Sequence, residues 1–241
     1  MTAERGFVSL VRHGQASFGQ ENYDQLSPLG GEQLEHVGRH LAQREEPIDL
    51  IIRGDLARHE QSVEAFLRGY GARPEVDVVA DWNEFDHRAV IRAYAKDQAD
   101  LRAWFANPKP LNTQSPAEKQ KIMQIFREAV LRWQRGQHDQ DYQETWLGFS
   151  ERVTRAWQST QTQLQGRQTI LVLTSGGPIA LSVMASLALP HEAMLTLNQR
   201  LVNGGMTRFL TAADGQAQPE LLSLNEQQHF LGKYRHLLTY I

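Results

Sequence analysis

The sequence contains no cysteine among its 241 residues, which excludes disulfide bonds, thiol catalysis and cysteine metal sites. It also has no apolar run of membrane-spanning length, and Met1–Gly6 has no apolar signal core. The net charge of −3 provides no basic field for nucleic acid or for an anionic membrane surface. These absences predict a cytoplasmic protein with neither nucleic acid nor a membrane as partner. They leave its oligomeric state open.

The sequence does contain enough apolar residues for a large core, because they make up 41% of the chain beside 22% charged residues. Short apolar runs alternate with helical stretches. This alternation predicts an α/β fold with a doubly wound, mostly parallel sheet flanked by helices. Strands are expected at Phe7–Val11, Ile48–Ile52, Glu75–Ala80, Gln168–Thr174, 202–210 and 220–224.

Helices are expected from capping signals and from the spacing of apolar residues. Ser27 is a good N-cap, and Pro28 follows it at the first helical position. Two more helices are expected over about 56–70 and over 179–189, each after a strand and a polar turn.

The region 90–145 differs from the rest, because it is helical in character, charged and rich in glutamine. A helix-breaking stretch, Asn107–Pro110, interrupts it. We interpret 90–145 as a helical insertion within a single α/β domain that spans 1–241, and we expect it to form a cap over the pocket.

Three of the expected strands end in polar or glycine-containing turns, namely Arg12-His13-Gly14, Asp55–Arg58 and Ser175-Gly176-Gly177. Parallel strands bring such ends to one edge of a sheet, where ligands bind in open α/β folds. Two arginines and a histidine at that edge predict a site for a phosphate dianion, since the planar guanidinium group fits phosphate oxygens.

The same residues indicate a chemistry as well as a binding site. His13 is a candidate nucleophile for phosphorus, and the flanking arginines disfavour its imidazolium form and keep the ring neutral. The leaving oxygen needs a proton, and Glu84, which follows the third expected strand, is the candidate donor. A bound phosphate raises the pKa of a neighbouring carboxyl group and so keeps it protonated.

The turn after the first strand resembles the signature of the histidine phosphatase superfamily, also called phosphoglycerate-mutase-like. The resemblance covers nearly the whole chain apart from the inserted helices. Arg-His-Gly alone is a weak pattern, but matches in order along the chain are specific. They are Leu10–Gln15, Ser27–Gly30 with Gln33, Asp55–Arg58, Trp82–Glu84 and Asn203.

The resemblance implies a mechanism and a set of binding residues. His13 would be phosphorylated and then dephosphorylated by water, and Glu84 would act as proton donor and then as base. Arg12 and Arg58 would hold the phosphoryl oxygens of a small phosphorylated substrate. The resemblance implies no metal and no cofactor.

One position departs from the family pattern. The family usually has a second histidine after the late central strand, whereas this chain has Ser175, followed by Gly176. A serine supplies one hydrogen bond but no charge, and the loss of one preorganised donor lowers a rate by roughly 10²–10³-fold. We therefore predict that Ser175 and Gly176 still line the pocket, and we hypothesise that His87 points into it and partly replaces the missing imidazole.

The other histidines have no partner pattern and are assigned no role. His36 and His40 have the i, i+4 spacing of a metal-binding pair, but no third ligand is near in sequence, so a solvated helix face is expected. The unassigned histidines are His36, His40, His59, His138, His191, His229 and His236.

Three functions remain open on the sequence alone. The first is a phosphohydrolase of small phosphate monoesters. The second is a phosphate-ester or phosphoprotein binding module with little turnover owing to Ser175. A mutase comes third, because it must protect its phosphohistidine from water and relies on the full pair of histidines.

Overall fold

The computed structural model describes residues 5–17, 24–96, 98–106 and 115–240. The chain divides into two compact units, one comprising Met1–Glu84 with Arg152–Ile241 and the other Phe85–Glu151. The second unit includes the range 90–145 of the predicted insertion and extends beyond it at both ends. That this unit acts as a cap stays a prediction, and the breaker stretch 107–110 lies outside the described residues.

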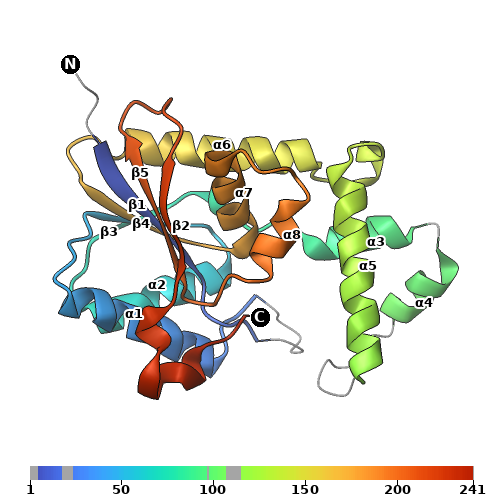
Figure 1. The fold of residues 1–241 in the computed structure, drawn as a ribbon, viewed down its shortest axis with the longest axis horizontal. Helices are drawn as coiled ribbons and strands as arrows, with labels where there is room; N and C mark the ends of the chain where they lie inside the picture. Colours follow the sequence, from blue (N-terminus) through green and yellow to red (C-terminus); the bar gives the residue numbers. More distant parts are fainter. Residues whose placement is uncertain (1–4, 18–23, 97, 107–114, 241) are drawn as a thin grey trace. The chain divides into compact units, whose positions relative to one another are not determined.

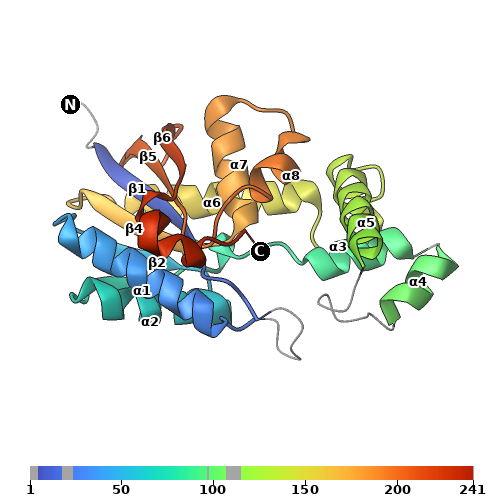
Figure 2. The same ribbon diagram turned by 60° about the horizontal axis from the view of Figure 1, so that its bottom comes forward.

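The first unit is built on a six-stranded sheet with the strand order β3-β2-β4-β1-β5-β6 (Figures 1 and 2). The four strands from β3 to β1 are parallel, whereas β5 pairs antiparallel with both β1 and β6. The predicted mostly parallel α/β fold is therefore confirmed. The strands are β1 (Arg5–Arg12), β2 (Leu50–Arg53), β3 (Glu75–Val78), β4 (Thr169–Thr174), β5 (Met206–Ala212) and β6 (Glu220–Glu226).

Helices cover both faces of this sheet, with α1 and α2 side by side on one face and α6 and α7 on the other (Figures 1 and 2). Apolar side chains of β1, β2 and β4 form a buried core with α1 and α2. The helices of this unit are α1 (Pro28–Gln43), α2 (Ala57–Tyr70), α7 (Gly176–Leu187), α8 (Ala193–Asn198) and most of α6 (Trp146–Thr162), with 3₁₀ helices η1 (Ala80–Trp82), η4 (Gln228–Phe230) and η5 (Gly232–Leu237).

The start of α1 follows the predicted capping signal. The Ser27 hydroxyl accepts a hydrogen bond from the Gly30 N–H at 3.0 Å, and Pro28 occupies the first turn. Glycines then let α1 approach α2 closely, because a Cβ added at Gly38 would overlap the carbonyl oxygen of Phe66. The two helices consequently pack backbone to backbone beneath the sheet.

The prediction for the start of α7 was wrong by three residues. The helix begins at Gly176 and ends at Leu187, whereas the sequence favoured 179–189. Gly176 and Gly177 adopt helical geometry in its first turn instead of forming a separate loop. As a result, Ser175 directly joins β4 to the helix as its N-cap residue.

The second unit is helical and has its own aromatic core. It contains α3 (His87–Ala95), α4 (Ala99–Ala106), α5 (Pro116–Gln134), the 3₁₀ helix η3 (Asp139–Asp141) and the beginning of α6. Ring centroids of Phe85 and Trp133 are 4.9 Å apart, and those of Trp133 and Trp146 are 5.2 Å apart. No helix among the described residues is long and apolar enough to cross a membrane.

Candidate active site

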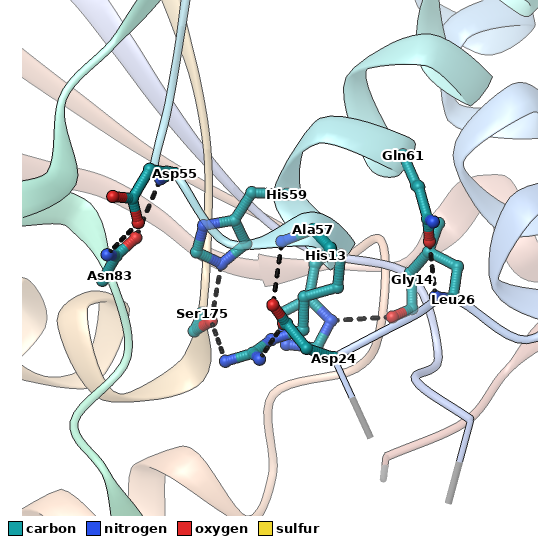
Figure 3. A network of polar contacts seen from close by, with 11 residues as sticks. His13, Gly14, Asp24, Leu26, Asp55, Ala57, His59, Gln61, Asn83 and Ser175 are labelled. Atoms are coloured by element: carbon teal, nitrogen blue, oxygen red, sulfur yellow. Dashed lines mark hydrogen bonds and ion pairs between the residues drawn. The ribbon is translucent and has the colours of Figure 1, made fainter. Parts of the chain in front are cut away.

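His13 follows β1 directly and is buried, with 7% of its surface exposed. Its Nδ1 lies 2.7 Å from the carbonyl oxygen of Gly14 (Figure 3). Because a carbonyl oxygen only accepts hydrogen bonds, Nδ1 carries the hydrogen and Nε2 keeps its lone pair. The local backbone thus fixes the tautomer in which Nε2 carries the lone pair.

The surroundings of His13 keep its ring neutral at pH 7. Burial lowers the pKa of His13 well below its usual value, and the positive charges of Arg58 and Arg12 lower it further. Sequence reasoning attributed this effect to the arginines alone, whereas burial is the larger cause. A neutral imidazole is the form that a nucleophilic role requires.

Three separate segments hold the backbone around His13. The His13 N–H donates to the Thr174 carbonyl at 2.8 Å, and the Asn203 side chain donates to the His13 carbonyl at 3.1 Å. The Gly14 N–H donates to the hydroxyl of Ser62, a residue of α2, at 3.2 Å. The nucleophile candidate is therefore fixed to β4, to the turn that precedes β5 and to α2.

Arg58 is the second residue of α2 and is also buried. Its Nη1 forms an ion pair with Asp24 at 2.6 Å, and the other oxygen of that carboxylate accepts from the Ala57 N–H at 2.9 Å. Leu56, the N-cap residue of α2, provides no side-chain hydrogen bond. Asp24, which is far away in sequence, therefore caps the N-terminus of α2 (Figure 3). Its carboxylate lies where the Arg58 guanidinium and the positive end of the helix both attract an anion.

Arg12, the last residue of β1, donates hydrogen bonds to backbone carbonyls in the C-terminal part of the chain. Its Nη1 donates to the carbonyl oxygens of Leu201 and Tyr240. The positive charge of Arg12 lowers the pKa of His13, in the same direction as burial. Direct contact between Arg12 and a phosphoryl oxygen stays a prediction.

Ser175 joins this group from the end of β4, and Gly176 follows it in α7. The Ser175 hydroxyl makes no capping bond to its own helix. It lies 3.5 Å from Nη2 of Arg58 and 2.8 Å from Nε2 of His59, and neither Ser175 nor His59 has exposed surface (Figure 3). The structure thus brings Ser175 together with Arg58, while contact of Ser175 and Gly176 with substrate stays a prediction.

Sequence reasoning missed His59, to which it assigned no role. The ring centroids of His13 and His59 are 5.8 Å apart, and burial lowers the pKa of His59 well below its usual value. The spacing of buried residues on α2 contained the signal, because His59 lies four residues before Val63 and seven before Phe66, on the face that packs into the core.

Glu84 is placed beside the start of α7, where its carboxylate accepts a hydrogen bond from the Gly177 N–H at 3.1 Å. The preceding segment is fixed by Arg152, whose guanidinium donates to the carbonyl oxygens of Asp81 and Asn83 at 3.0 and 2.8 Å. Its catalytic role stays a prediction. His87 begins α3 in the second unit, and its hypothesised place in the pocket likewise stays a prediction.

The expectation of a solvated face for His36 was wrong. His36 is buried, with its Nε2 donating to the carbonyl oxygen of His229 at 2.7 Å and its ring centroid 3.9 Å from that of Tyr234. Within the described ranges, no group of three histidine, aspartate or glutamate side chains has the geometry of a metal site.

The end of β1 and the start of α2 thus bring a buried neutral histidine close to two arginines in an α/β protein with a mixed sheet. The sequence profile of the histidine phosphatase superfamily (branch 1) matches residues 8–119 and 113–226. The chain belongs to the histidine phosphatase superfamily.

Solved structures with the same fold come from several organisms. The α-ribazole phosphatase of Shigella flexneri is 20% identical with a TM-score of 0.57, and the match covers 91% of this chain and 96% of that one. A phosphoglycerate mutase of Bacillus anthracis is 12% identical with a TM-score of 0.59, covering 94% and 96%. The phosphoserine phosphatase of Entamoeba histolytica is 16% identical with a TM-score of 0.55, covering 94% and 100%. A sequence search of curated proteins finds no match to this chain.

Proposed function

We propose that this protein is a phosphohydrolase of small phosphate monoesters that works through a phosphohistidine on His13. The observation behind the proposal is the state of that ring, which is buried, neutral and fixed by the Gly14 carbonyl with Nε2 as its nucleophilic nitrogen. The positive charge of Arg58 beside it suits a phosphate dianion. Membership of the histidine phosphatase superfamily supports the same chemistry.

In the first step, Nε2 of His13 attacks phosphorus and the bond from phosphorus to the ester oxygen breaks. Protonated Glu84 gives its proton to the departing oxygen, which leaves as an alcohol. The ring gains positive charge as the P–N bond forms, and the Gly14 carbonyl, which accepts the Nδ1 hydrogen, stabilises that charge. Arg58 and Arg12 neutralise the charge on the phosphoryl oxygens.

In the second step, water attacks phosphorus from the side opposite the P–N bond. The Glu84 carboxylate takes the proton of the water, the P–N bond breaks, and inorganic phosphate leaves. His13 returns to its neutral form and Glu84 is protonated again. The proposed step requires neither a metal nor an organic cofactor, and we keep the cytoplasm as the predicted location.

The proposal is tested with a generic aryl phosphate, comparing the wild type with His13→Ala. We expect turnover by the wild type and its loss, by at least about 10³-fold, in the variant, because the variant lacks the proposed nucleophile. His236→Ala is the matched control, since His236 is an exposed histidine on η5, and it should retain full activity. A screen of phosphorylated metabolites with the same pair of proteins then identifies the substrate.

The binding module is the second candidate, and the presence of Ser175 where a second histidine is expected is the feature that favours it. Such a module binds phosphate or vanadate without turning over any ester. Binding of vanadate together with a failed screen for turnover would reject the phosphohydrolase and leave the module.

A further inference from the structure

The hydroxyl group of Ser175 makes contacts that differ from those of an ordinary helix N-cap residue. Serine at the N-cap of a helix normally accepts a hydrogen bond from a backbone N–H of the first turn. Ser175 makes no such bond. Instead its Oγ lies 2.8 Å from Nε2 of His59 and 3.5 Å from Nη2 of Arg58 (Figure 3). The hydroxyl is therefore turned away from its own helix and toward α2.

The surroundings of the His59 ring decide which of its nitrogens carries the hydrogen. Its Nδ1 is buried and has no hydrogen-bond partner among the described residues. It faces Gly54, where an added Cβ would overlap it. A buried N–H without an acceptor is rarer in proteins than a buried acceptor without a donor. The hydrogen of the neutral ring therefore belongs on Nε2, which donates to the Ser175 hydroxyl.

The hydrogen-bonding capacity of Ser175 follows from this assignment. A hydroxyl group has two acceptor lone pairs and one donor hydrogen. His59 and Arg58 both approach Oγ as donors, so they occupy the two lone pairs. What remains is the O–H hydrogen, which Ser175 has to donate to a third group. A phosphoryl oxygen bound to Nη2 of Arg58 would provide that acceptor, since Nη2 lies 3.5 Å from the Ser175 Oγ.

We propose that Ser175 donates a hydrogen bond to the phosphoryl group and that His59 is the positioning residue that fixes the Ser175 hydroxyl as a donor. This inference rests on the proposed function, because it assigns a further contact within the same site. The imidazole that the family usually provides after the late central strand is thus replaced by a pair of residues from two elements, β4 and α2. Burial of both side chains strengthens the donor, since no water competes with it.

Three variants test the inference through kcat on an aryl phosphate. Ser175→Ala removes the donor, and we expect kcat to fall by about 10²-fold. His59→Leu leaves the hydroxyl in place but frees it to rotate, and we expect a fall of about 10-fold or more. His59→Gln keeps an amide N–H near the position of Nε2. Its kcat should therefore stay within a few-fold of the wild-type value, unlike that of His59→Leu. Thermal unfolding of each variant verifies that it folds.

A double variant separates this role from mere packing. If His59 acts through Ser175, His59→Leu has little further effect on kcat once Ser175 is alanine. If His59 only supports the fold, its effect on kcat is the same in both backgrounds, and that result would overturn the inference. So would an unchanged kcat in folded His59→Leu.

Vanadate binding distinguishes a failure of this inference from a failure of the proposed function. If the wild type turns over no ester, the phosphohydrolase is rejected. The vanadate affinities of the variants still test whether Ser175 contacts the bound anion. We then expect Ser175→Ala and His59→Leu to weaken vanadate binding by about 10-fold and His59→Gln to preserve it. Equal vanadate affinity in all variants, or no binding to the wild type, would reject the donor role.

Discussion

At the scale of single residues, the space around Ser175 is filled by His59, whose Nε2 is 2.8 Å from the serine Oγ with both side chains fully buried. An imidazole introduced at position 175 has to displace that ring. We expect Ser175→His to lower the free energy of unfolding by about 1–3 kcal/mol and to lower kcat. Urea unfolding and aryl phosphate turnover measure the two effects.

The matched variant carries His59→Ala in addition to Ser175→His. Removal of the His59 ring makes room for the new imidazole, so we expect the double variant to regain stability and activity relative to Ser175→His alone. Full stability of Ser175→His by itself would show that the pocket accommodates both rings and would contradict this account.

At the scale of elements, the close approach of α1 and α2 depends on Gly38 and Gly69. A Cβ at Gly38 would overlap the Phe66 carbonyl oxygen, and one at Gly69 would overlap the Glu35 carbonyl oxygen. We expect Gly38→Ala to push the helices apart and to lower the free energy of unfolding by about 1–3 kcal/mol, as measured by urea unfolding. Arg58 and His59 lie on α2, so kcat should fall as well.

Gly31→Ala is the control for this prediction. Gly31 lies in α1, and an added Cβ there meets no atom within 4 Å. Alanine has a higher helix propensity than glycine, so this variant should be as stable as the wild type or more stable by up to about 1 kcal/mol. Equal destabilisation by both substitutions would mean that helix contact is not the cause.

At the scale of the whole molecule, buried neutral histidines make folding sensitive to acid. Burial lowers the pKa of His229 to about 4, and this residue of η4 donates from Nε2 to the Gly204 carbonyl at 3.1 Å. Between that pKa and about 6.5, the value of an unperturbed histidine, the unfolded chain binds a proton that the native state excludes. Stability is therefore constant with respect to this group above pH 6.5 and falls as the pH drops below it.

For His229 alone, we expect a loss of about 2 kcal/mol between about pH 7 and about pH 5. His13 and His59 add to the loss in the same direction, because burial lowers the pKa of each. Urea unfolding at the two pH values measures the total. His229→Gln keeps a donor for Gly204 but removes the titration, so the pH dependence should shrink by about 2 kcal/mol. An unchanged pH dependence in that variant would exclude His229 as a source.

How far the sequence predicts this molecule depends on the range of the interactions involved. Apolar runs and polar strand ends were sufficient to predict the sheet and to group Arg58, Ser175 and His13, because a parallel sheet brings such ends together. The start of α7 was missed, since the glycines after Ser175 were interpreted as a loop although they adopt helical geometry. The burial of His59 could be read from the spacing of apolar residues on α2, but its contact with Ser175 could not, because the two residues lie 116 positions apart and no local pattern encodes that contact.

The carboxylate of Asp24 influences which anions can bind at Arg58. It already holds Nη1 of Arg58 and the N–H of Ala57, so the positive end of α2 is neutralised by the chain itself before any substrate arrives. On the proposed function, a phosphoryl oxygen at Nη2 of Arg58 lies next to this carboxylate, and a substrate that also takes Nη1 exchanges one anion for another. A singly charged anion such as chloride or acetate gains little electrostatic energy by replacing a carboxylate of equal charge. A doubly charged phosphate ester gains more, so the Asp24 carboxylate favours the binding of dianions over monoanions.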